Sequence, residues 1–252
     1  MKVRCKENSR ARKKLPQKTP ARTQVRCKEK DAAQCRGVPM KILAIADLHA
    51  DEDALDRLRV LSGRQEYGSV LIAGDITNNG PISYLSDVLG LFPNALAVHG
   101  NMDPPQARTL LAQRGCSVHG RRVAFGEKKE WNIVGLGGSN PTPFHTPSEN
   151  SEEEIAATLA GSGMDRFSIL LSHPPPYGVF DTVAGGVHAG STALRAAIDE
   201  KKPLMCICAH IHEHEGQEVV GGTLVVKLGA AIKGRAAEIT LGDKMEVQFI
   251  SL

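Results

Sequence analysis

Residues 40–49 read MKILAIADLH, a short apolar run that ends in two residues able to bind a metal, Asp47 and His49. The run over 41–46 is almost entirely apolar, which is typical of a strand buried on both faces of a parallel sheet. In open α/β sheets, ligands gather at the carboxyl ends of such strands. This stretch therefore predicts an α/β fold and also the edge on which its site lies.

Four further apolar runs repeat this arrangement along the chain. They cover residues 69–74, 94–100, 167–172 and 204–209. The residues that directly follow these runs also have ligand chemistry: Asp75, Asn101, His173, and the pair His210 and His212. Side chains two apart on a strand project to the same side, so Asp47 with His49, and His210 with His212, are each expected to converge. Five strand ends thus predict one metal-binding edge.

Small or rigid residues flank three of these positions. Gly74 and Gly100 precede Asp75 and Asn101, where the missing Cβ lets backbone approach closely. A proline follows His173 and restricts it to an extended conformation. Each motif alone is common in turns and loops, but their joint occurrence in this order favours a metal site over coincidence.

Helical periodicity occupies most of the intervals between the apolar runs. We expect helices over residues 51–61, 81–91, 104–114, 151–160 and 191–199. We expect short strands over 117–136, a β-meander over 219–250 with a hairpin at Gly221-Gly222, and long site-lining loops over 137–147 and 174–190. The pattern predicts two facing sheets with helices on the outer layers.

Residues 1–39 differ from the rest of the 252-residue chain. They hold 13 of the 31 Lys and Arg residues and only 3 of the 28 acidic residues, so the remainder of the chain is acidic. With almost no apolar periodicity, this segment is expected to be a disordered tail before a single domain over 40–252. A basic tail can contact nucleic acid, but we favour a solvated tail because a charge run alone is weak evidence.

The cysteines and the apolar segments indicate where in the cell the protein is located. Six cysteines form no CxxC pair, which indicates a reducing cytoplasm rather than a disulfide framework. No apolar run approaches the ~18 residues of a membrane-spanning helix. The basic residues are not followed by the apolar h-region that a secretory signal needs. We therefore expect a cytoplasmic protein without a membrane partner, whose oligomeric state the sequence leaves open.

Five blocks of the sequence together resemble the calcineurin-like metallophosphoesterases, in particular their small phosphodiesterase-type branch. The blocks are DLH (47–49), GDITNNG (74–80), GNMD (100–103), SHPPP (172–176) and AHIHE (209–213). The resemblance extends from about residue 40 to the C-terminus. It implies a four-layer αββα sandwich, in which helices flank two mixed β-sheets, and a phosphoesterase that is more similar to phosphodiesterases than to protein phosphatases.

The resemblance also implies a dinuclear metal centre. Asp75 would bridge two metals, and the other six ligands would divide into Asp47, His49 and His212 at one metal and Asn101, His173 and His210 at the other. Such a pair of cations activates a water as hydroxide for attack on a small phosphate ester. Four imidazoles, two carboxylates and an amide suit Mn, Fe, Zn or Ni better than Mg or Ca.

One position departs from the family pattern. Met102 stands where the family has a histidine that stabilises the transition state or protonates the leaving oxygen, and methionine can do neither. His188, in the long loop after the fourth block, is our candidate substitute, so the expected catalytic residues are Asp75, Asn101 and His188. Two alternatives stay open: the basic tail and the resemblance allow a metal-dependent nuclease, and Met102 allows a catalytically weak interaction scaffold of the same fold.

Overall fold

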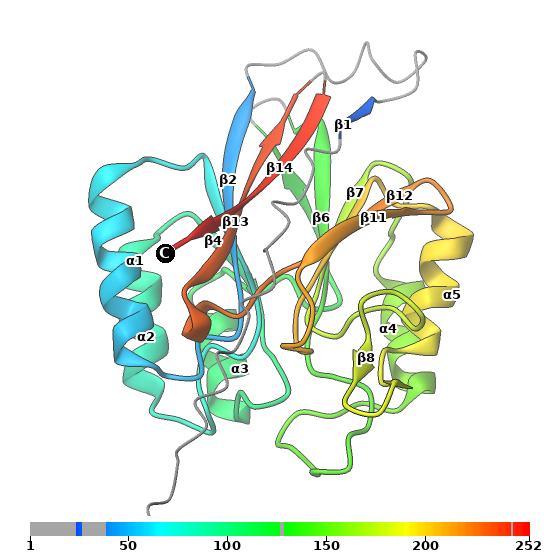
Figure 1. The fold of residues 1–252 in the computed structure, drawn as a ribbon, viewed down its shortest axis with the longest axis horizontal. Coiled ribbons are helices and arrows are strands. Elements are labelled where there is room, and N and C mark those ends of the chain that lie inside the picture. The colour runs from blue at the N-terminus through cyan, green and yellow to red at the C-terminus, as the bar shows by residue number, and fades with distance from the viewer. Residues whose placement is uncertain (1–23, 27–38, 127–128, 243) are drawn as a thin grey trace, which may run out of the picture.

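The computed structural model describes residues 24–26, 39–126, 129–242 and 244–252, and its strands form two six-stranded sheets packed face to face (Figure 1). In spatial order, the first sheet contains β1 (Gln24–Arg26), β14 (Lys244–Ser251), β13 (Arg235–Leu241), β2 (Met40–Ile45), β3 (Ser69–Ala73) and β4 (Ala95–Val98). The second contains β11 (Gly216–Val220), β12 (Thr223–Lys227), β10 (Met205–Cys208), β7 (Ser168–Ser172), β6 (Trp131–Leu136) and β5 (Arg122–Phe125). A separate short hairpin joins β8 (Thr182–Val183) to β9 (Val187–His188).

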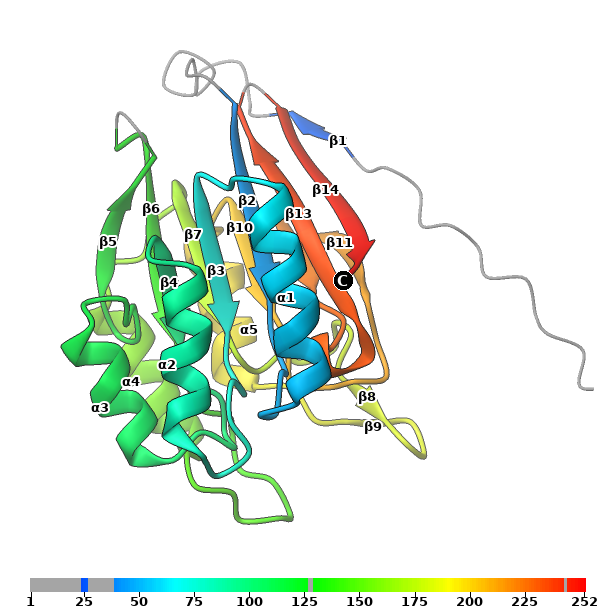
Figure 2. The same cartoon turned by 90° about the vertical axis from the view of Figure 1, so that its left-hand side faces the viewer.

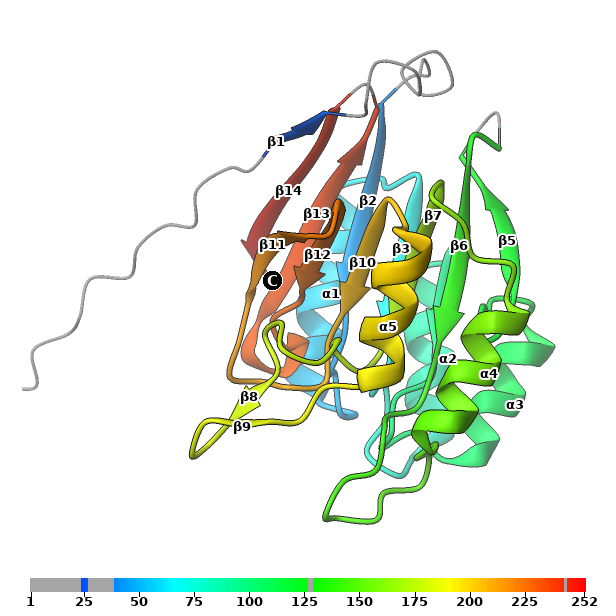
Figure 3. The same ribbon diagram turned by 90° about the vertical axis from the view of Figure 1, so that its right-hand side faces the viewer.

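Helices cover the outer face of each sheet (Figures 2 and 3). The first sheet carries α1 (Glu52–Arg64), α2 (Ile82–Leu91) and α3 (Pro105–Gln113), and the second carries α4 (Glu152–Gly161) and α5 (Thr192–Lys201). Local sequence sets where they begin: the Asp51 side chain accepts a hydrogen bond from Ala54 N at 2.7 Å, and Ser151 with Glu154 forms a capping box at α4. The five helices predicted from periodicity are confirmed.

Three apolar layers hold the sheets and helices together. On β2, Ile42 and Ala44 point into the layer between the two sheets, whereas Leu43 and Ile45 point into the layer beneath α1 and α2. A third layer lies between the second sheet and helices α4 and α5. Because both faces of each central strand are buried, its sequence is apolar almost throughout. The predicted four-layer αββα sandwich with mixed sheets is confirmed.

Parallel pairing places the ends of the central strands at one edge of the molecule. Strands β2, β3 and β4 are parallel to one another, as are β6, β7, β10 and β12, while the outer pairings are antiparallel. The carboxyl ends of both parallel sets point to the same end of the sandwich (Figure 1). We call this end the carboxyl edge.

The prediction of one continuous β-meander over 219–250 is wrong. Strands β11 and β12 form a hairpin in the second sheet, whereas β13 and β14 form a hairpin in the first. The chain crosses between the sheets through the short 3₁₀ helix η1 (Ala231–Lys233). Alternation and turn residues predict hairpins, but they do not determine which sheet a hairpin joins.

The basic segment falls mostly outside the described residues. Within it, β1 pairs antiparallel with residues 244–246 at the start of β14, which is the end of the sandwich opposite the carboxyl edge. This strand was not predicted, and the expectation of a disordered tail is otherwise untested. No helix among the described residues has the length and apolar character needed to cross a membrane.

Candidate metal centre

Two groups of potential metal ligands meet at the carboxyl edge. In each group, one ligand atom from each of three residues lies within 4.8 Å of the others. The first group is Asp47, His49 and His212, and the second is Asp75, His173 and His210. The residues come from strand ends in both sheets, so neither group exists until the two sheets pack together.

The backbone at these positions differs from the extended strand that the sequence suggested. Asp47, His49, Asp75 and His210 have φ angles of 56°, 51°, 48° and 73°, in the left-handed region that residues other than glycine adopt uncommonly. Side-chain alternation along a strand is therefore the wrong reason for their convergence. The chain turns sharply after each strand, and such costly backbone conformations cluster at functional sites.

Gly74 lies where two of these turns approach one another. Its φ is +90°, and a Cβ there would lie 2.6 Å from His173 Nδ1 and 2.7 Å from the Cα of Gly100. Only glycine provides both the conformation and the space. The turn that carries Asp75 is therefore packed directly on the turn that carries Asn101.

The Asp75 carboxylate lies between the two ligand groups. Its Oδ2 is 3.7 Å from His49 Nε2 in one group and 3.4 Å from His173 Nε2 in the other. Its Oδ1 accepts a hydrogen bond from the backbone nitrogen of Met102 at 2.8 Å. One oxygen is thus fixed by the protein, and the other occupies the position that a bridging ligand would need.

Hydrogen bonds also orient His173 and Asn101. His173 Nδ1 donates to the carbonyl of Ala73 at 2.7 Å, so Nε2 is the nitrogen available to a metal. That Nε2 lies 2.9 Å from Asn101 Oδ1, while Asn101 Nδ2 donates to Thr146 Oγ1 at 3.0 Å. The amide of Asn101 therefore presents its oxygen to the second ligand group.

Buried acceptors indicate that these residues suit cations. Asp47 is fully buried, and its Oδ1 has no hydrogen-bond partner among the described residues. Nearby, His49 Nε2 and His212 Nε2 approach to 3.3 Å with their rings edge to face. A buried carboxylate oxygen without a donor is costly unless a cation satisfies it. Carboxylate and imidazole donors of this kind fit divalent transition metals.

The electrostatics of the centre favour positive charge. Burial alone would lower the pKa of His173, but the carboxylates of Asp75 and Asp47 raise it to about 9. Burial, together with the nearby His173, lowers the pKa of His210 to about 3. Burial would raise the pKa of Asp75, yet the charge of His173 lowers it. The two carboxylates therefore remain anionic and attract a cation.

The chain matches the model of the calcineurin-like phosphoesterase superfamily domain over residues 40–242. It belongs to that family. An uncharacterized protein of Methanocaldococcus jannaschii is 33% identical over 201 residues, which cover 74% of this chain and 87% of that protein. The family assignment agrees with the five sequence blocks and with the two groups of potential ligands.

Solved structures share the fold of this calcineurin-like phosphoesterase. The protein TT1561 of Thermus thermophilus has a TM-score of 0.63 and 18% identity, with 84% of this chain and 99% of that chain covered. A dimetal phosphatase from Danio rerio has a TM-score of 0.56 and 14% identity, with 84% and 98% covered. A novel archaeal phosphodiesterase has a TM-score of 0.52 and 14% identity, with 84% and 100% covered. At these identities the likeness establishes the fold.

Asp103 joins the turn that carries Asp75 to the turn that carries Asn101. Its carboxylate accepts hydrogen bonds from Thr77 N at 2.7 Å, from Thr77 Oγ1 at 2.8 Å and from Gly100 N at 2.8 Å. Burial and the charge of Asp75 raise the pKa of Asp103 to about 6, so it is still an anion and a full acceptor at neutral pH. Asp103 is the last residue of the block GNMD (100–103), and only the structure shows which backbone groups it orients.

Replacing Asp103 with asparagine should loosen both turns. The amide NH₂ would face backbone donors, and Asp75 and Asn101 would lose their fixed positions. We expect metal affinity or turnover to fall about 10- to 100-fold, as is usual for residues that orient ligands. Isothermal titration with Mn²⁺ on this variant and on the parent would measure the change. An unchanged affinity together with unchanged turnover would contradict it.

Sequence analysis did not identify Lys227 as part of the site. This lysine is completely buried on β12, and its Nζ donates to the carbonyl of Leu228 at 2.9 Å. Burial lowers its pKa, whereas Asp47 opposes that shift. The sequence does contain a signal for Lys227: it is a single lysine inside the apolar stretch TLVVKLG (223–229). A lysine in a buried strand indicates a compensating negative charge nearby, because lysine is seldom fully buried without one.

His188 belongs to neither ligand group, and its role remains a prediction. It lies on β9, with 43% of its side chain exposed, and its Nδ1 is 2.6 Å from Asp181 Oδ1. Met102 contributes its backbone nitrogen to Asp75, as described above, while its side chain brings no proton donor. The loop 174–190, expected to line a site, contains the β8–β9 hairpin, which lies at the carboxyl edge of the sandwich (Figure 1).

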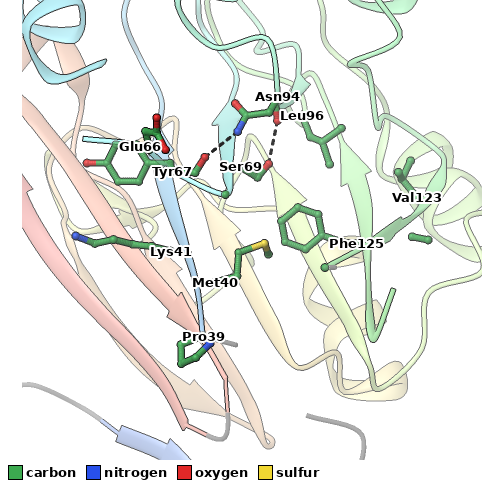
Figure 4. Close-up of a pocket in the computed structure, with 13 residues that line it drawn as sticks. Pro39, Met40, Lys41, Glu66, Tyr67, Ser69, Asn94, Leu96, Val123 and Phe125 are labelled. Carbon is green, nitrogen blue, oxygen red and sulfur yellow. Dashed lines mark hydrogen bonds between the residues drawn. The ribbon is translucent and has the colours of Figure 1, made fainter. Parts of the chain in front are cut away.

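A cavity of about 710 Å³ lies at the opposite end of the sandwich (Figure 4). Its lining includes Met40 and Tyr67, near the starts of β2 and β3 in the first sheet, and Phe125, at the end of β5 in the second sheet. Polar groups in its wall bond to one another, as Asn94 Nδ2 does to the carbonyl of Tyr67 at 2.9 Å. None of the seven predicted ligands lines this cavity; the two groups of potential ligands lie in the turns of the carboxyl edge.

Proposed function

We propose that this calcineurin-like phosphoesterase hydrolyses phosphodiesters at a dinuclear metal centre. The ligands would be Asp47, His49, Asp75, Asn101, His173, His210 and His212. The observation that carries the proposal is the place of Asp75, whose Oδ2 lies between two groups of ligand atoms. The dimetal phosphatase and the archaeal phosphodiesterase that share the fold support this class of chemistry.

The protein's own residues hold and orient the centre. When bound, two divalent cations would stabilise charge on the attacking and leaving oxygens and would lower the pKa of a water. Mn, Fe, Zn and Ni all suit the donor set, and manganese is a reasonable first choice for reconstitution. Ala73 fixes the tautomer of His173, Thr146 orients Asn101, and Met102 N holds one oxygen of Asp75.

Exposed apolar side chains favour a diester over a bare phosphate monoester. Four of the large apolar residues exposed in the described part of the chain lie on segments next to the centre: Phe144, Tyr177, Val187 and Ile232. Ile232 N donates to the carbonyl of Asp47 at 3.1 Å, and Phe144 lies two residues before Thr146, the partner of Asn101. A diester carries a second organic group that such side chains can contact.

A pair of matched substrates tests this proposal. After reconstitution with Mn²⁺, Ni²⁺ or Zn²⁺, we expect bis-p-nitrophenyl phosphate to be hydrolysed at least about 10-fold more efficiently than p-nitrophenyl phosphate, a difference of roughly 1.4 kcal/mol in transition-state stabilisation. The comparison uses kcat/KM for the full chain. A preference for the monoester would contradict the diesterase, and no hydrolysis of either by a metal-loaded protein would favour the scaffold alternative.

The nuclease alternative depends on the basic tail. The described part of that segment, β1, is attached to the first sheet at the end opposite the centre, which gives no support to a tail that presents nucleic acid to the metals. Adding a single-stranded oligonucleotide to the assay would test it. A cytoplasmic location remains our expectation, supported by the buried, unpaired Cys116, Cys206 and Cys208.

A further inference from the structure

Asp181 and His188 form a carboxylate–imidazole pair on the loop that follows β7. Asp181 is 1% exposed, and its Oδ2 accepts hydrogen bonds from Gly178 N at 2.9 Å and from Gly190 N at 3.1 Å. Its Oδ1 accepts from His188 Nδ1 at 2.6 Å. The carboxylate is therefore held rigidly, and it places the proton-bearing Nδ1 of His188 inward.

The pair leaves the other imidazole nitrogen available. Among the described residues, Nε2 of His188 has no hydrogen-bond partner. The ring packs against Tyr177, with 5.1 Å between the ring centroids, which limits its rotation. A histidine whose Nδ1 is bound to a carboxylate presents Nε2 in a fixed direction, and this is how enzymes position an imidazole for proton transfer.

Hydrogen bonds attach this hairpin and the residue after it to neighbouring segments of the chain. Thr182, which is opposite His188 in the β8–β9 register, accepts a hydrogen bond through its carbonyl from Nε2 of His214 at 2.8 Å. His214 follows the predicted ligand His212 by two residues. The residue after β9 is attached as well: the carbonyl of Ala189 accepts a hydrogen bond from Asn140 Nδ2 at 3.1 Å.

A third attachment runs through the segment after His173. Ser191 N donates to the carbonyl of Pro175 at 3.0 Å, and Tyr177 N donates to the carbonyl of Ser191 at 3.0 Å. The hairpin is therefore bound to segments that follow His173 and His212, one from each ligand group. Figures 1 and 3 show it at the carboxyl edge, below α5.

We propose that His188 is the general acid of the reaction and that Asp181 is its positioning residue; the proposal rests on the function proposed above. Water attacks phosphorus, and the P–O bond to the leaving group breaks with its electron pair on the leaving oxygen. Nε2–H of His188 gives that oxygen a proton, so the products are an alcohol and a phosphate monoester. The proton that the attacking water loses passes to solvent, from which His188 is protonated again.

This role explains how the site works without the family histidine at position 102. The backbone of Met102 keeps its structural bond to Asp75, but the thioether has no proton to transfer. A proton donor for the leaving oxygen then has to come from another segment. The Asp181–His188 pair supplies one from the loop that follows the fourth motif.

Leaving-group dependence tests the proposal. Bis-p-nitrophenyl phosphate and diphenyl phosphate have similar shapes, but p-nitrophenolate leaves readily without a proton and phenolate does not. In the Mn²⁺-loaded full chain, His188→Asn retains an NH group for Asp181 but has no transferable proton. We expect kcat to fall about 100-fold or more for diphenyl phosphate and only a few-fold for bis-p-nitrophenyl phosphate, within the usual range for a general acid.

Two controls separate this role from a structural one. Asp87→Asn alters an exposed side chain of α2 that belongs to neither ligand group and should leave kcat unchanged for both esters. The acid is the protonated imidazole, which carries hydrogen on both Nδ1 and Nε2; in the metal-free protein, ¹⁵N NMR at a pH where His188 is neutral should show the Nδ1–H tautomer that Asp181 holds, and Asp181→Asn should shift that tautomer. Equal losses of kcat for both esters, or no loss, would overturn the proposal. An inactive parent chain would instead refute the proposed function.

Discussion

Asp75→Asn should abolish phosphodiester hydrolysis and release metal from the protein. The carboxylate supplies the oxygen that lies between the two ligand groups, whereas an amide offers one neutral oxygen and a competing NH₂. Loss of a residue that only orients a ligand costs about 10- to 100-fold, so loss of the bridge should cost more than about 100-fold in kcat. Metal content by mass spectrometry and turnover of bis-p-nitrophenyl phosphate are the measurements.

Asp87→Asn is the matched control for this substitution. Asp87 is an exposed residue of α2, so the same chemical change there should alter neither metal content nor turnover. The reason for the large effect at Asp75 is its burial, with 2% of the residue exposed, because solvent cannot replace the missing charge. An Asp75→Asn protein that keeps both metals and a tenth of its turnover would refute the bridging role.

Gly100→Ala should damage both the fold and the site. A Cβ at this position would collide with the Asp75 carboxylate and with the backbone nitrogen of Asp75. A side chain can rotate away from such a clash, but the backbone nitrogen cannot, so the turns that carry Asp75 and Asn101 must separate. We expect the free energy of unfolding to fall by about 1–3 kcal/mol, as for other overpacked buried sites, with loss of hydrolysis. Thermal unfolding and the diester assay would measure both effects.

Gly90→Ala provides the comparison. This glycine lies in α2, and an added Cβ would meet no atom within 4 Å. Alanine is the better helix former, so the free energy of unfolding of the variant should rise by up to about 1 kcal/mol, and the variant should keep full activity. If Gly100→Ala were as stable and active as Gly90→Ala, the close packing of the two turns would have no functional importance.

Much of the fold was predictable because its determinants are local. The apolar run over 41–46 specifies a strand buried on both faces, and the cap residues Asp51 and Ser151 specify where two helices begin. The order of strands and helices then permits few architectures other than an αββα sandwich. The β-meander was mispredicted because β12 and β13 follow one another closely in sequence yet pair in different sheets.

The sequence by itself determined which residues have ligand chemistry and that each follows a buried strand. Only the tertiary structure decided how they meet: Asp75 between His49 and His173, Asp103 across two turns, and Asp181 against His188. Most of these contacts join residues that are far apart in the chain, so no local pattern encodes them. They form because parallel pairing within a sheet places the turns that follow its strands side by side, and because the two sheets bury their apolar faces against each other and so bring both sets of turns to one edge.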